Sequence, residues 1–504
     1  MKSKITIKLI SLTLALVVLA GCEKDFLELK PRGTELEGNF YQNQDQVFQG
    51  LISVYDVYQW GTSGGYTMKM PLLTVASDEA YAGGSDASDQ PSWVAFDNFT
   101  LNPYLGPQTG LWQKNFTGIY RANLLLDKIE QVPVTIDPSF KNRVIAEAKT
   151  LRAYFYFDLV RFFGNVPLII GQIPQSDLYK QPQATPEQIF AQIEQDLSEA
   201  REALPNNTNF SMPDNEKGRL TRSAATAMLA KVILFQNEEV RMAEAATLLK
   251  EVNSTPGYNL LPNYGDIFRP DNKYNQESIL EIPHSNNAAW GDWGWVNGGE
   301  GNVGVQFVGP ADYNGPTFSN GWGFAPISLE LVAALKDDPR FEYTIIDGLK
   351  MKEAGATYRA RYQNTDYFIR KYAPQKAFRS SQGTAEINWP INEIEIRLAD
   401  TYLLEAEALL RSGGDLNRAK SLLDAVRGRV GLSSVPVTLE NIYQERRLEL
   451  ATEGHRFFDL VRTGKASEVL GPFGFTAGKN EVLPIPQQEI DVTNNVLKQN
   501  PNYN

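Results

Sequence analysis

The sequence predicts a mainly α-helical protein in which tetratricopeptide-like helix pairs form one scaffold, with long irregular loops and a few short strands. Apolar residues recur at three- and four-residue steps through most of the chain, which is the period of a helix rather than of a strand. Two helix–turn–helix segments share one spacing of small residues, from Ala230 to Ala243 and from Ala406 to Ala419. In contrast, residues 288–324 are too rich in glycine for any helix.

The composition is that of a globular protein with a sizeable core. The chain has 504 residues, of which 42% are hydrophobic and 21% charged. Its formal net charge is −12, and the first 21 residues hold three lysines and no acidic residue, so without them the charge falls to −15. We therefore expect no nucleic-acid partner, because the phosphates would be repelled.

The N-terminus predicts export and lipid attachment. Residues 1–21 combine three lysines with an apolar stretch, residues 9–19, that is too short for a typical membrane span, which is the pattern of a signal peptide. Leu19-Ala20-Gly21-Cys22 then matches the bacterial lipobox, in which the cysteine becomes the acylated first residue. Cys22 is the only cysteine of the chain, so no disulfide can form within it. Residues 22–40, which begin with an acidic run, are predicted to be a tether.

Four helices are predicted in the first 200 residues from their apolar stripes. The last of them begins at Thr185-Pro186, where proline at the first helical position costs no hydrogen bond. The stretch NVPLII after Gly164 is predicted to be extended. The first three helices are expected at residues 47–58, 110–129 and 140–163.

Residues 391–464 contain the clearest helical pattern. A first helix with apolar residues from Leu398 to Leu410 is expected to end at Gly413 and Gly414, and Asp415 is expected to cap a second. A third helix is predicted at about residues 439–451.

Three glutamates lie four residues apart in this region, at Glu445, Glu449 and Glu453, with Arg446 and Arg447 beside them. Such a face suits an ion-pair lattice that fastens helices together better than a paired-carboxylate catalytic site. Further along, Arg456, Asp459 and Arg462 are expected to bridge to neighbouring helices.

The insert at residues 77–93 is predicted to be a surface loop that carries binding groups. It has no helical or strand period, it contains two adjacent glycines, and Tyr81 and Trp93 lie near its ends. Asp78, Tyr81 and Trp93 are candidate ligand contacts. Asp86 and Asp89 do not have the spacing of an EF-hand calcium loop, so no metal is expected.

The segment at residues 288–324 is the second candidate for a binding loop. It holds Trp290, Trp293, Trp295 and Trp322, with ten glycines and no lysine or arginine between Trp290 and Gly323. A loop of this length is functional or disordered, and its aromatic rings argue against disorder. The rings either form a satellite core or offer flat faces to the C–H faces of sugar rings, while polar groups such as Tyr313 read the hydroxyls.

Several shorter elements are expected towards the C-terminus. Residues 327–335 are predicted to be a helix, Asp338-Pro339-Arg340 a turn tied by an Asp–Arg pair, residues 358–372 a short hairpin, and residues 483–490 an extended tail.

Catalytic and cofactor motifs are scarce. His284 and His455 are the only histidines, which makes a histidine metal cluster or a Ser–His–Asp triad improbable, and no phosphate-binding glycine loop precedes a helix. We therefore expect no catalytic residue, cofactor or metal site. Glycosidase carboxylates stay open, because 60 acidic residues allow many distant pairs.

Several motifs together resemble the SusD/RagB family of nutrient-capturing lipoproteins on the outer surface of Bacteroidetes. They are ERRLELATEGHRFFDLVRTG, preceded by IRLADTYLLEAEALL, followed by LPIPQQEI and QNPNY, and joined by EAKTLRAYFYFDLVRFFGNVPLI at residues 147–169. The resemblance covers nearly the whole mature chain. It implies four helix pairs in one scaffold, with residues 41–270 and 271–504 forming one compact unit.

The resemblance also implies a function. Members of the family that bind glycans use an aromatic platform made from loops. They are anchored in the outer membrane by a lipid on the residue that matches Cys22, and they act as a lid over a SusC-like TonB-dependent transporter. The sequence thus predicts a surface-facing binding protein that delivers oligosaccharide or polysaccharide to such a transporter. Two alternatives are peptide capture, as in RagB-like members, and a surface glycoside hydrolase.

Overall fold

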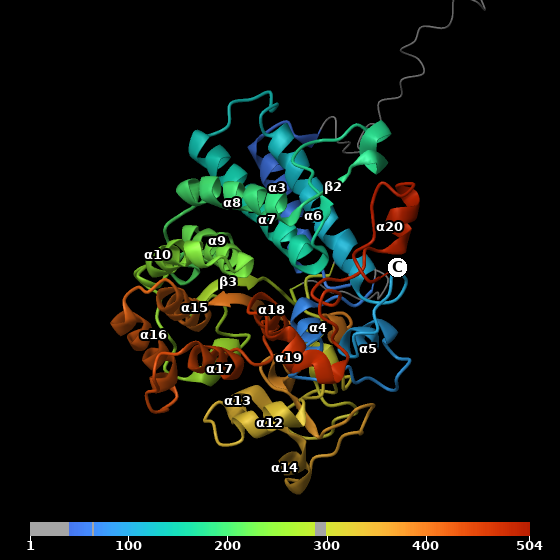
Figure 1. The fold of residues 1–504 in the computed structure, drawn as a ribbon, viewed down its shortest axis with the longest axis vertical. Helices are drawn as coiled ribbons and strands as arrows, with labels where there is room; N and C mark the ends of the chain where they lie inside the picture. Colours follow the sequence, from blue (N-terminus) through green and yellow to red (C-terminus); the bar gives the residue numbers. More distant parts are fainter. Residues whose placement is uncertain (1–39, 63–64, 288–298, 504) are drawn as a thin grey trace, which may run out of the picture.

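A computed structural model of the chain describes residues 40–62, 65–287 and 299–503 (Figure 1). The fold is mainly helical with a few short strands, as predicted. The predictions for residues 1–39, which include the signal peptide, Cys22 and the tether, lie outside the described residues. No helix in the described part of the chain has both the length and the apolar character of a membrane span.

Nine helices of the described chain form a continuous scaffold in which successive members pack against one another. In Figure 1 this scaffold runs from the top of the molecule down its left side, and α10 packs against α15 although far apart in sequence. The helices are α3 (Gln44–Gln59), α6 (Gln108–Lys128), α7 (Pro138–Phe163), α8 (Pro186–Ala203), α9 (Arg222–Gln236), α10 (Met242–Asn253), α15 (Leu398–Arg411), α16 (Leu416–Arg429) and α17 (Leu439–Glu449).

Side chains placed just before these helices fix where they begin. Asp137 accepts a hydrogen bond from the backbone N–H of Phe140 (2.8 Å), which starts α7 two residues before the predicted helix. Thr185 and Gln188 form a capping box at the start of α8. As predicted, Asp415 caps α16 by accepting from the N–H groups of Asn417 and Arg418.

The repeat of small residues holds in three of its four positions. Ala230, Ala406 and Ala419 are fully buried between helices. Ala243, by contrast, is exposed on α10, where Ala245 fills the corresponding buried position. The two helix pairs are therefore similar in architecture, but their alanine spacing does not mark equivalent crossings.

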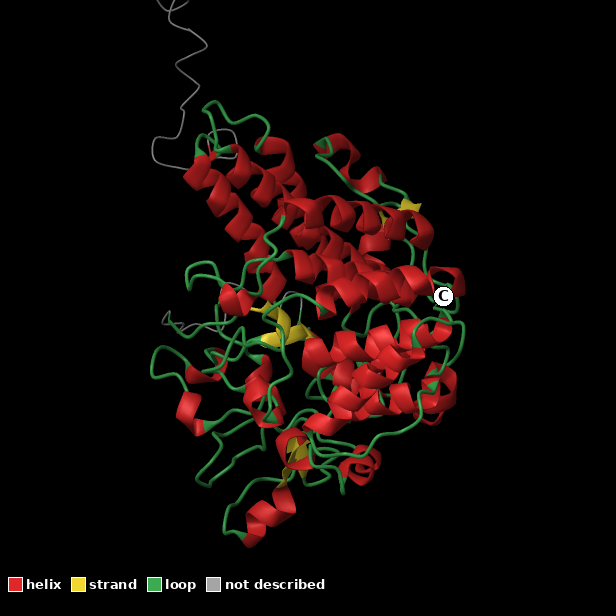
Figure 2. Cartoon of the chain, turned by 90° about the vertical axis from the view of Figure 1, so that its left-hand side faces the viewer, coloured by secondary structure: helices red, strands yellow, loops and turns green. Residues whose placement is uncertain are grey.

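The remaining elements are short, and most of the long loops gather on one side of the scaffold, to the lower left in Figure 2. The helices are α4 (Lys69–Val75), α5 (Pro91–Asp97), α11 (Gly304–Val308), α12 (Leu329–Leu335), α13 (Phe341–Thr344), α14 (Gly348–Glu353), α18 (Arg456–Arg462), α19 (Ala466–Leu470) and α20 (Gln487–Val492). The strands are β1 (Val166–Pro167), β2 (Gln183–Ala184), β3 (Ser278–Ile282), β4 (Ile345–Asp347), β5 (Tyr367–Ile369) and β6 (Glu393–Arg397).

The strands form three antiparallel pairs, β1–β2, β3–β6 and β4–β5. The predicted hairpin at residues 358–372 is wrong, because β5 pairs with β4, which lies outside that range, with Ile345 opposite Ile369. The C-terminal tail was predicted to be extended, yet α20 occupies part of it. Local alternation of residue types does not reveal a partner strand that lies elsewhere in the chain.

Buried arginines join the scaffold to β6 and to the turn before α13. Arg397 donates from Nε to Glu453 Oε2 (2.8 Å) and from Nη1 to Glu449 Oε1 (2.6 Å) and Glu277 Oε1 (2.9 Å). Arg340 donates from Nη1 to Glu445 Oε1 (2.6 Å) and Glu449 Oε2 (2.9 Å). Both arginines are completely buried. The predicted ion-pair lattice is therefore confirmed for all three glutamates.

The arginines adjacent to those glutamates have other partners. Arg446 pairs with Asp400 and Asp459, whereas Arg447 pairs with Asp78 (2.9 Å). Arg340 also ties the turn to Asp338 through Nε (2.9 Å) and Nη2 (2.7 Å), as predicted. The lattice thus spreads over neighbouring segments instead of lying along one helix.

The segment from Asp78 to Gly84 links the scaffold to the loop side. Arg456 on α18 donates to Asp78 Oδ1 (2.7 Å). Ser328 at the start of α12 donates from Oγ to the carbonyl of Asp78 (2.7 Å) and from N to that of Glu79 (2.9 Å). Further along, Gly84 N donates to the carbonyl of Gly323 (3.1 Å). This segment is therefore held at both ends.

Asp97, at the end of α5, also holds the segment from Asp78 to Gly84 through hydrogen bonds. Its Oδ2 accepts from the N–H of Ala82 (2.9 Å) and from Nε2 of Gln363 (3.3 Å), and Gln363 Oε1 accepts from the N–H of Gly83 (3.2 Å). Burial raises the pKa of Asp97 to about 6 in spite of these donors.

Replacing Arg397 by Met is expected to lower the free energy of unfolding by roughly 3–5 kcal/mol, because it leaves buried carboxylates without a counter-charge. Urea denaturation followed by circular dichroism measures the loss. The matched control is Arg379→Met, since that side chain is 51% exposed and its Nη2 lies 3.4 Å from Glu386, for which we expect a change within about 1 kcal/mol. Similar losses in both variants would contradict this role of Arg397.

Replacing Asp97 by Asn is expected to change how stability depends on pH. Folded Asp97 keeps its proton up to a pKa of about 6, whereas in the unfolded chain it loses it near 3.9, so its titration lowers the wild-type free energy of unfolding as pH rises from 4 to 6. The amide of Asp97→Asn has no such titration and can still accept both hydrogen bonds. The difference between variant and wild type should therefore shift by roughly 2–3 kcal/mol in favour of the variant between pH 4 and pH 7. A difference that is constant with pH, measured by urea denaturation, would contradict it.

Candidate functional site

An aromatic cavity of about 170 Å³ lies on the loop side of the molecule. Four of the residues that line it are aromatic and three are polar: Tyr66, Phe307, Trp322 and Phe324, with Asp89, Gln90 and Arg361. Tyr66 comes just before α4 and Gln90 just before α5, while Phe307 lies on α11. The cavity is thus assembled from five segments that are far apart in the sequence. We call it the aromatic cavity below.

Phe307 forms the floor of the aromatic cavity. It is completely buried, and its ring centroid lies 4.7 Å from that of Tyr66, 5.0 Å from Trp322 and 4.8 Å from Phe324. Behind it, the ring of Trp93 lies 5.2 Å away. These edge-on and tilted contacts are the favoured geometry for aromatic pairs, so the rings that line the cavity are held in fixed orientations.

Backbone hydrogen bonds set the position of Trp322 and Phe324. Trp322 N donates to the carbonyl of Gln306 (2.9 Å), and Phe324 N donates to that of Phe307 (2.9 Å). The chain can approach closely here because Gly83 lies opposite with φ +69°, and a Cβ atom at that position would come within 2.6 Å of the carbonyl oxygen of Gly323. A side chain on Gly83 would therefore push the rim apart.

Polar groups border the aromatic cavity on two sides. Asp89 Oδ2 accepts hydrogen bonds from the N–H (2.8 Å) and Oγ (2.9 Å) of Ser85. Burial, and then the nearby carboxylate of Asp89, raise the pKa of Tyr66, so its phenol stays protonated at neutral pH. Arg361 lies across the cavity and comes within 3.9 Å of Asp312. Flat ring faces with hydrogen-bonding groups at the edge suit a ligand with apolar faces and a polar rim.

Of the predicted ligand contacts, Trp322 lies in the aromatic cavity and Tyr81 lies outside its lining. Tyr81 is half-buried, and its hydroxyl donates to Glu330 Oε2 (3.4 Å). Direct contact of either residue with a ligand stays a prediction. Trp290, Trp293 and Trp295 lie outside the described residues, so their roles stay predictions as well.

Three other residues predicted to contact a ligand are buried in the structure, and their contact with a ligand stays a prediction. Trp93 is completely buried under Phe307, and its Nε1 donates to the carbonyl of Tyr66 (2.8 Å), so it supports the cavity without offering a face. Asp78 is buried and engaged with Arg447 and Arg456. Tyr313 is only 7% exposed and packs in a separate small core. Composition and loop position pointed to these residues, but it is tertiary packing that buries them.

Sequence reasoning missed Tyr66, Phe307 and Arg361. Tyr66 stands in a glycine-rich stretch without period, and Arg361 in a run of tyrosines and arginines. Neither pattern differs from that of an ordinary loop. The backbone pairing of residues 80–84 with residues 323–327, and of Tyr362 with Gly84, brings Arg361 close to Trp322 and Phe324, while the hydrogen bond from Trp93 to the carbonyl of Tyr66 holds Tyr66 nearby.

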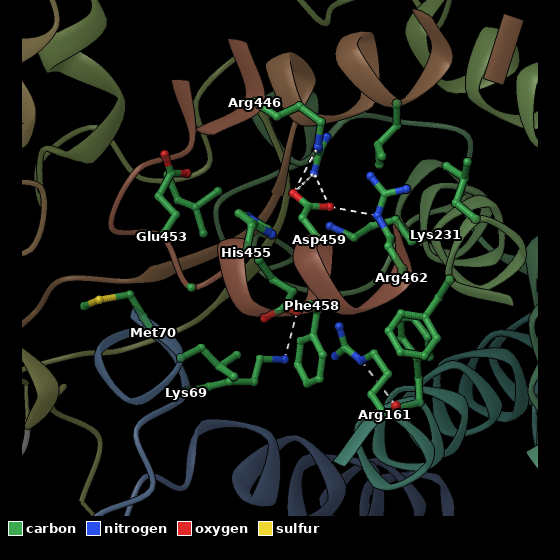
Figure 3. Close-up of a pocket in the computed structure, with 18 of the residues that line it drawn as sticks. Lys69, Met70, Arg161, Lys231, Arg446, Glu453, His455, Phe458, Asp459 and Arg462 are labelled. Atoms are coloured by element: carbon green, nitrogen blue, oxygen red, sulfur yellow. Dashed lines mark hydrogen bonds and ion pairs between the residues drawn. The ribbon is translucent and has the colours of Figure 1, made fainter. Parts of the chain in front are cut away.

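A second cavity, of about 50 Å³, lies among charged side chains between the scaffold and α18 (Figure 3). Its cations are engaged with carboxylates: Lys69 with Glu395 (2.8 Å), Lys231 with Asp400 (2.7 Å) and Arg462 with Glu407 (2.7 Å). These pairs join α4 to β6 and join α9 and α18 to α15, as predicted for Arg462.

The groups around this charged cavity are poorly suited to chemistry. Burial and the charge of Lys231 lower the pKa of His455 to about 4, so its ring is neutral at physiological pH. Arg446 and Arg462 hold the pKa of Asp459 far below its usual range, although burial opposes them. Within the described ranges, no group of three or more His, Cys, Asp or Glu side chains could hold a metal ion.

Comparison with known proteins assigns the family. A family model described as "SusD family" matches residues 266–503, and one described as "Starch-binding associating with outer membrane" matches residues 25–234. A curated "SusD-like protein" from Bacteroides ovatus is 27% identical and is aligned over 90% of this chain and 82% of its own.

Solved structures agree with this assignment. A "Laminarin binding SusD-like protein" is 45% identical, covers 92% of this chain and 100% of its own, and superposes with a TM-score of 0.85. "Surface glycan-binding protein A" from Bacteroides thetaiotaomicron, in complex with laminarihexaose, is 28% identical, with 90% and 99% coverage and a TM-score of 0.84. Because relatives of this similarity span nearly the whole chain, and the two family descriptions together account for most of it, this protein belongs to the SusD family.

Proposed function

We propose that this protein captures a laminarin-type glucan at the outer surface of the outer membrane and delivers it to a SusC-like TonB-dependent transporter. The aromatic cavity carries the proposal, because it combines ring faces on a rigid floor with polar groups at its edge. The 45% identical relative is described as laminarin-binding and the 28% identical relative was solved with laminarihexaose, and both support a glucan of this type.

The size of the cavity suits part of a long chain. At about 170 Å³ it is smaller than the ~300 Å³ or more of pockets that enclose a whole drug-sized ligand. A sugar residue that enters it would stack a C–H face on Trp322 or Tyr66, and the rest of the glucan would lie outside. Trp290, Trp293 and Trp295 would extend this contact along the glucan.

The proposed mechanism is reversible capture without bond cleavage. The relatives are described as glycan-binding proteins, and the charged groups of the second cavity are engaged with one another. The lipid on Cys22 would hold the protein beside its transporter, over which it would act as a lid. One acyl chain anchors only marginally, so contact with the transporter would add to the attachment.

Replacing Trp322 by Ala is expected to weaken binding of laminarihexaose on the order of tenfold, because the change removes a stacking face worth about 0.5–1.5 kcal/mol beyond its buried area. Isothermal titration calorimetry measures the affinity. Trp293→Ala tests the predicted extension in the same way.

The matched control is Tyr104→Ala, since Tyr104 is 82% exposed and is not among the residues that line the cavity. Equal affinity of Trp322→Ala and wild type, with unchanged circular dichroism, would refute the aromatic site. Binding of peptides instead of glucan would favour the peptide alternative, and release of sugar from the glucan would favour the hydrolase.

Replacing Cys22 by Ser is expected to abolish labelling with radioactive palmitate, because the acyl acceptor thiol is lost. The variant should also leave the outer-membrane fraction, which fractionation and immunoblotting measure. Unchanged labelling of the variant would contradict lipid attachment at Cys22.

A further inference from the structure

The polar rim of the aromatic cavity carries an inference that rests on the proposed function. We infer that the cavity selects uncharged sugar rings: Arg361 hydrogen-bonds to adjacent hydroxyls, while Asp89 excludes rings that bear a carboxylate or a sulfate. Arg361 would thus bind the hydroxyls of the sugar, and Asp89 would discriminate against a charged one.

Arg361 has hydrogen-bond donors to spare. Its Nε is buried without a hydrogen-bond partner among the described residues, so the donors that a ligand can reach are those of Nη1 and Nη2. Its Nη2 lies 3.9 Å from Asp312 Oδ2, beyond hydrogen-bond length. Arg397 differs, because all three of its guanidinium nitrogens donate to carboxylates or a carbonyl. Arg397 is therefore engaged within the protein, whereas Arg361 is available to a ligand.

The position of Arg361 directs these donors to the edge of a stacked ring. A Cβ atom on Gly323 would lie 3.2 Å from Arg361 Cγ, so the stem of the arginine runs along the backbone between Trp322 and Phe324. A sugar stacked on Trp322 points its equatorial hydroxyls outwards in the plane of its ring. A planar guanidinium beside that ring can donate two parallel hydrogen bonds to neighbouring oxygens, which the single ammonium of lysine cannot.

The carboxylate of Asp89 disfavours an acidic ligand in the cavity. Asp89 lines the cavity and has no cationic partner within salt-bridge distance among the described residues, and its charge reaches the phenol of Tyr66. Asp312 lies 3.7 Å from Arg359 and 3.9 Å from Arg361, so it offsets part of their charge. Arg361 and Asp89 are the charged residues of the lining, which therefore carries no net charge on a protein of charge −12. A carboxylate on the sugar would therefore be repelled by Asp89, and the lining has no net positive charge to offset that repulsion.

The test compares two hexasaccharides of equal length, laminarihexaose and a hexamer of glucuronic acid, by calorimetry at low and at physiological salt. Wild type should bind the neutral hexamer at least about tenfold more tightly than the acidic one, and low salt should widen the gap because it strengthens repulsion. Arg361→Met should weaken binding of the neutral hexamer by about tenfold, and Arg361→Lys by less.

Two further variants separate charge from hydrogen bonding. Asp89→Asn should raise the affinity for the acidic hexamer relative to that for laminarihexaose by about threefold or more, since it removes repulsion but can still accept from Ser85. Arg359→Met is the matched control: it removes the same charge beside Asp312 from a residue outside the cavity lining, and should leave neutral binding within about twofold.

The inference would be overturned if Arg361→Met bound laminarihexaose as tightly as the wild type does, or if the wild type preferred the acidic hexamer. Trp322→Ala would still test the proposed function in either case. A wild-type protein that binds neither hexamer would overturn both. Unchanged circular dichroism and melting temperature of each variant ensure that a loss of affinity is not a loss of fold.

Discussion

The buried guanidinium of Arg397 is the interaction on which the rest of this structure depends. It joins β6 to the carboxylates of Glu449 and Glu453 and to Glu277 just before β3, so one side chain fixes a strand pair against the end of α17. Replacing buried charges by apolar groups of equal shape often stabilises a protein, so such a lattice is better understood as fixing one arrangement than as adding stability. Charges that have few alternative partners in the core allow few alternative packings.

The ion-pair lattice positions the segments that line the aromatic cavity. Arg447 and Arg456 extend the ion pairs to Asp78, and the backbone from Asp78 onwards then pairs with the segment that carries Trp322 and Phe324. The position of a ring at the surface is therefore traceable, through a few hydrogen bonds, to charges in the core. In this design the scaffold does more than display loops, because it determines the distance between them.

Much of the fold was predictable from the sequence, and the reasons are local. Apolar periodicity and caps such as Asp415 located the long helices, because helix formation depends on neighbours three and four residues away. The glutamates four residues apart revealed the lattice for the same reason. The pairing of β4 with β5 was not predictable, since it depends on contacts between segments with no shared local signal.

The candidate site was predictable only in part. Trp322 was found because it stands in an unusual loop, but Trp93, equally conspicuous in sequence, proved to be completely buried. Tyr66 and Arg361 stand in unremarkable stretches and gain their meaning only from what lies across the cavity. Composition identifies residues able to stack on a sugar, whereas burial decides which of them are free to do so.

Phe307 belongs at once to the hydrophobic core and to the floor of the aromatic cavity. A floor made of core cannot yield when a ligand arrives, so the protein gives up little conformational entropy and most of the ordering cost falls on the sugar. The shared position of Phe307 also separates two kinds of evolutionary change. Substitutions at the floor would destabilise the fold, whereas substitutions at the rim could change the glycan specificity and leave the fold unchanged.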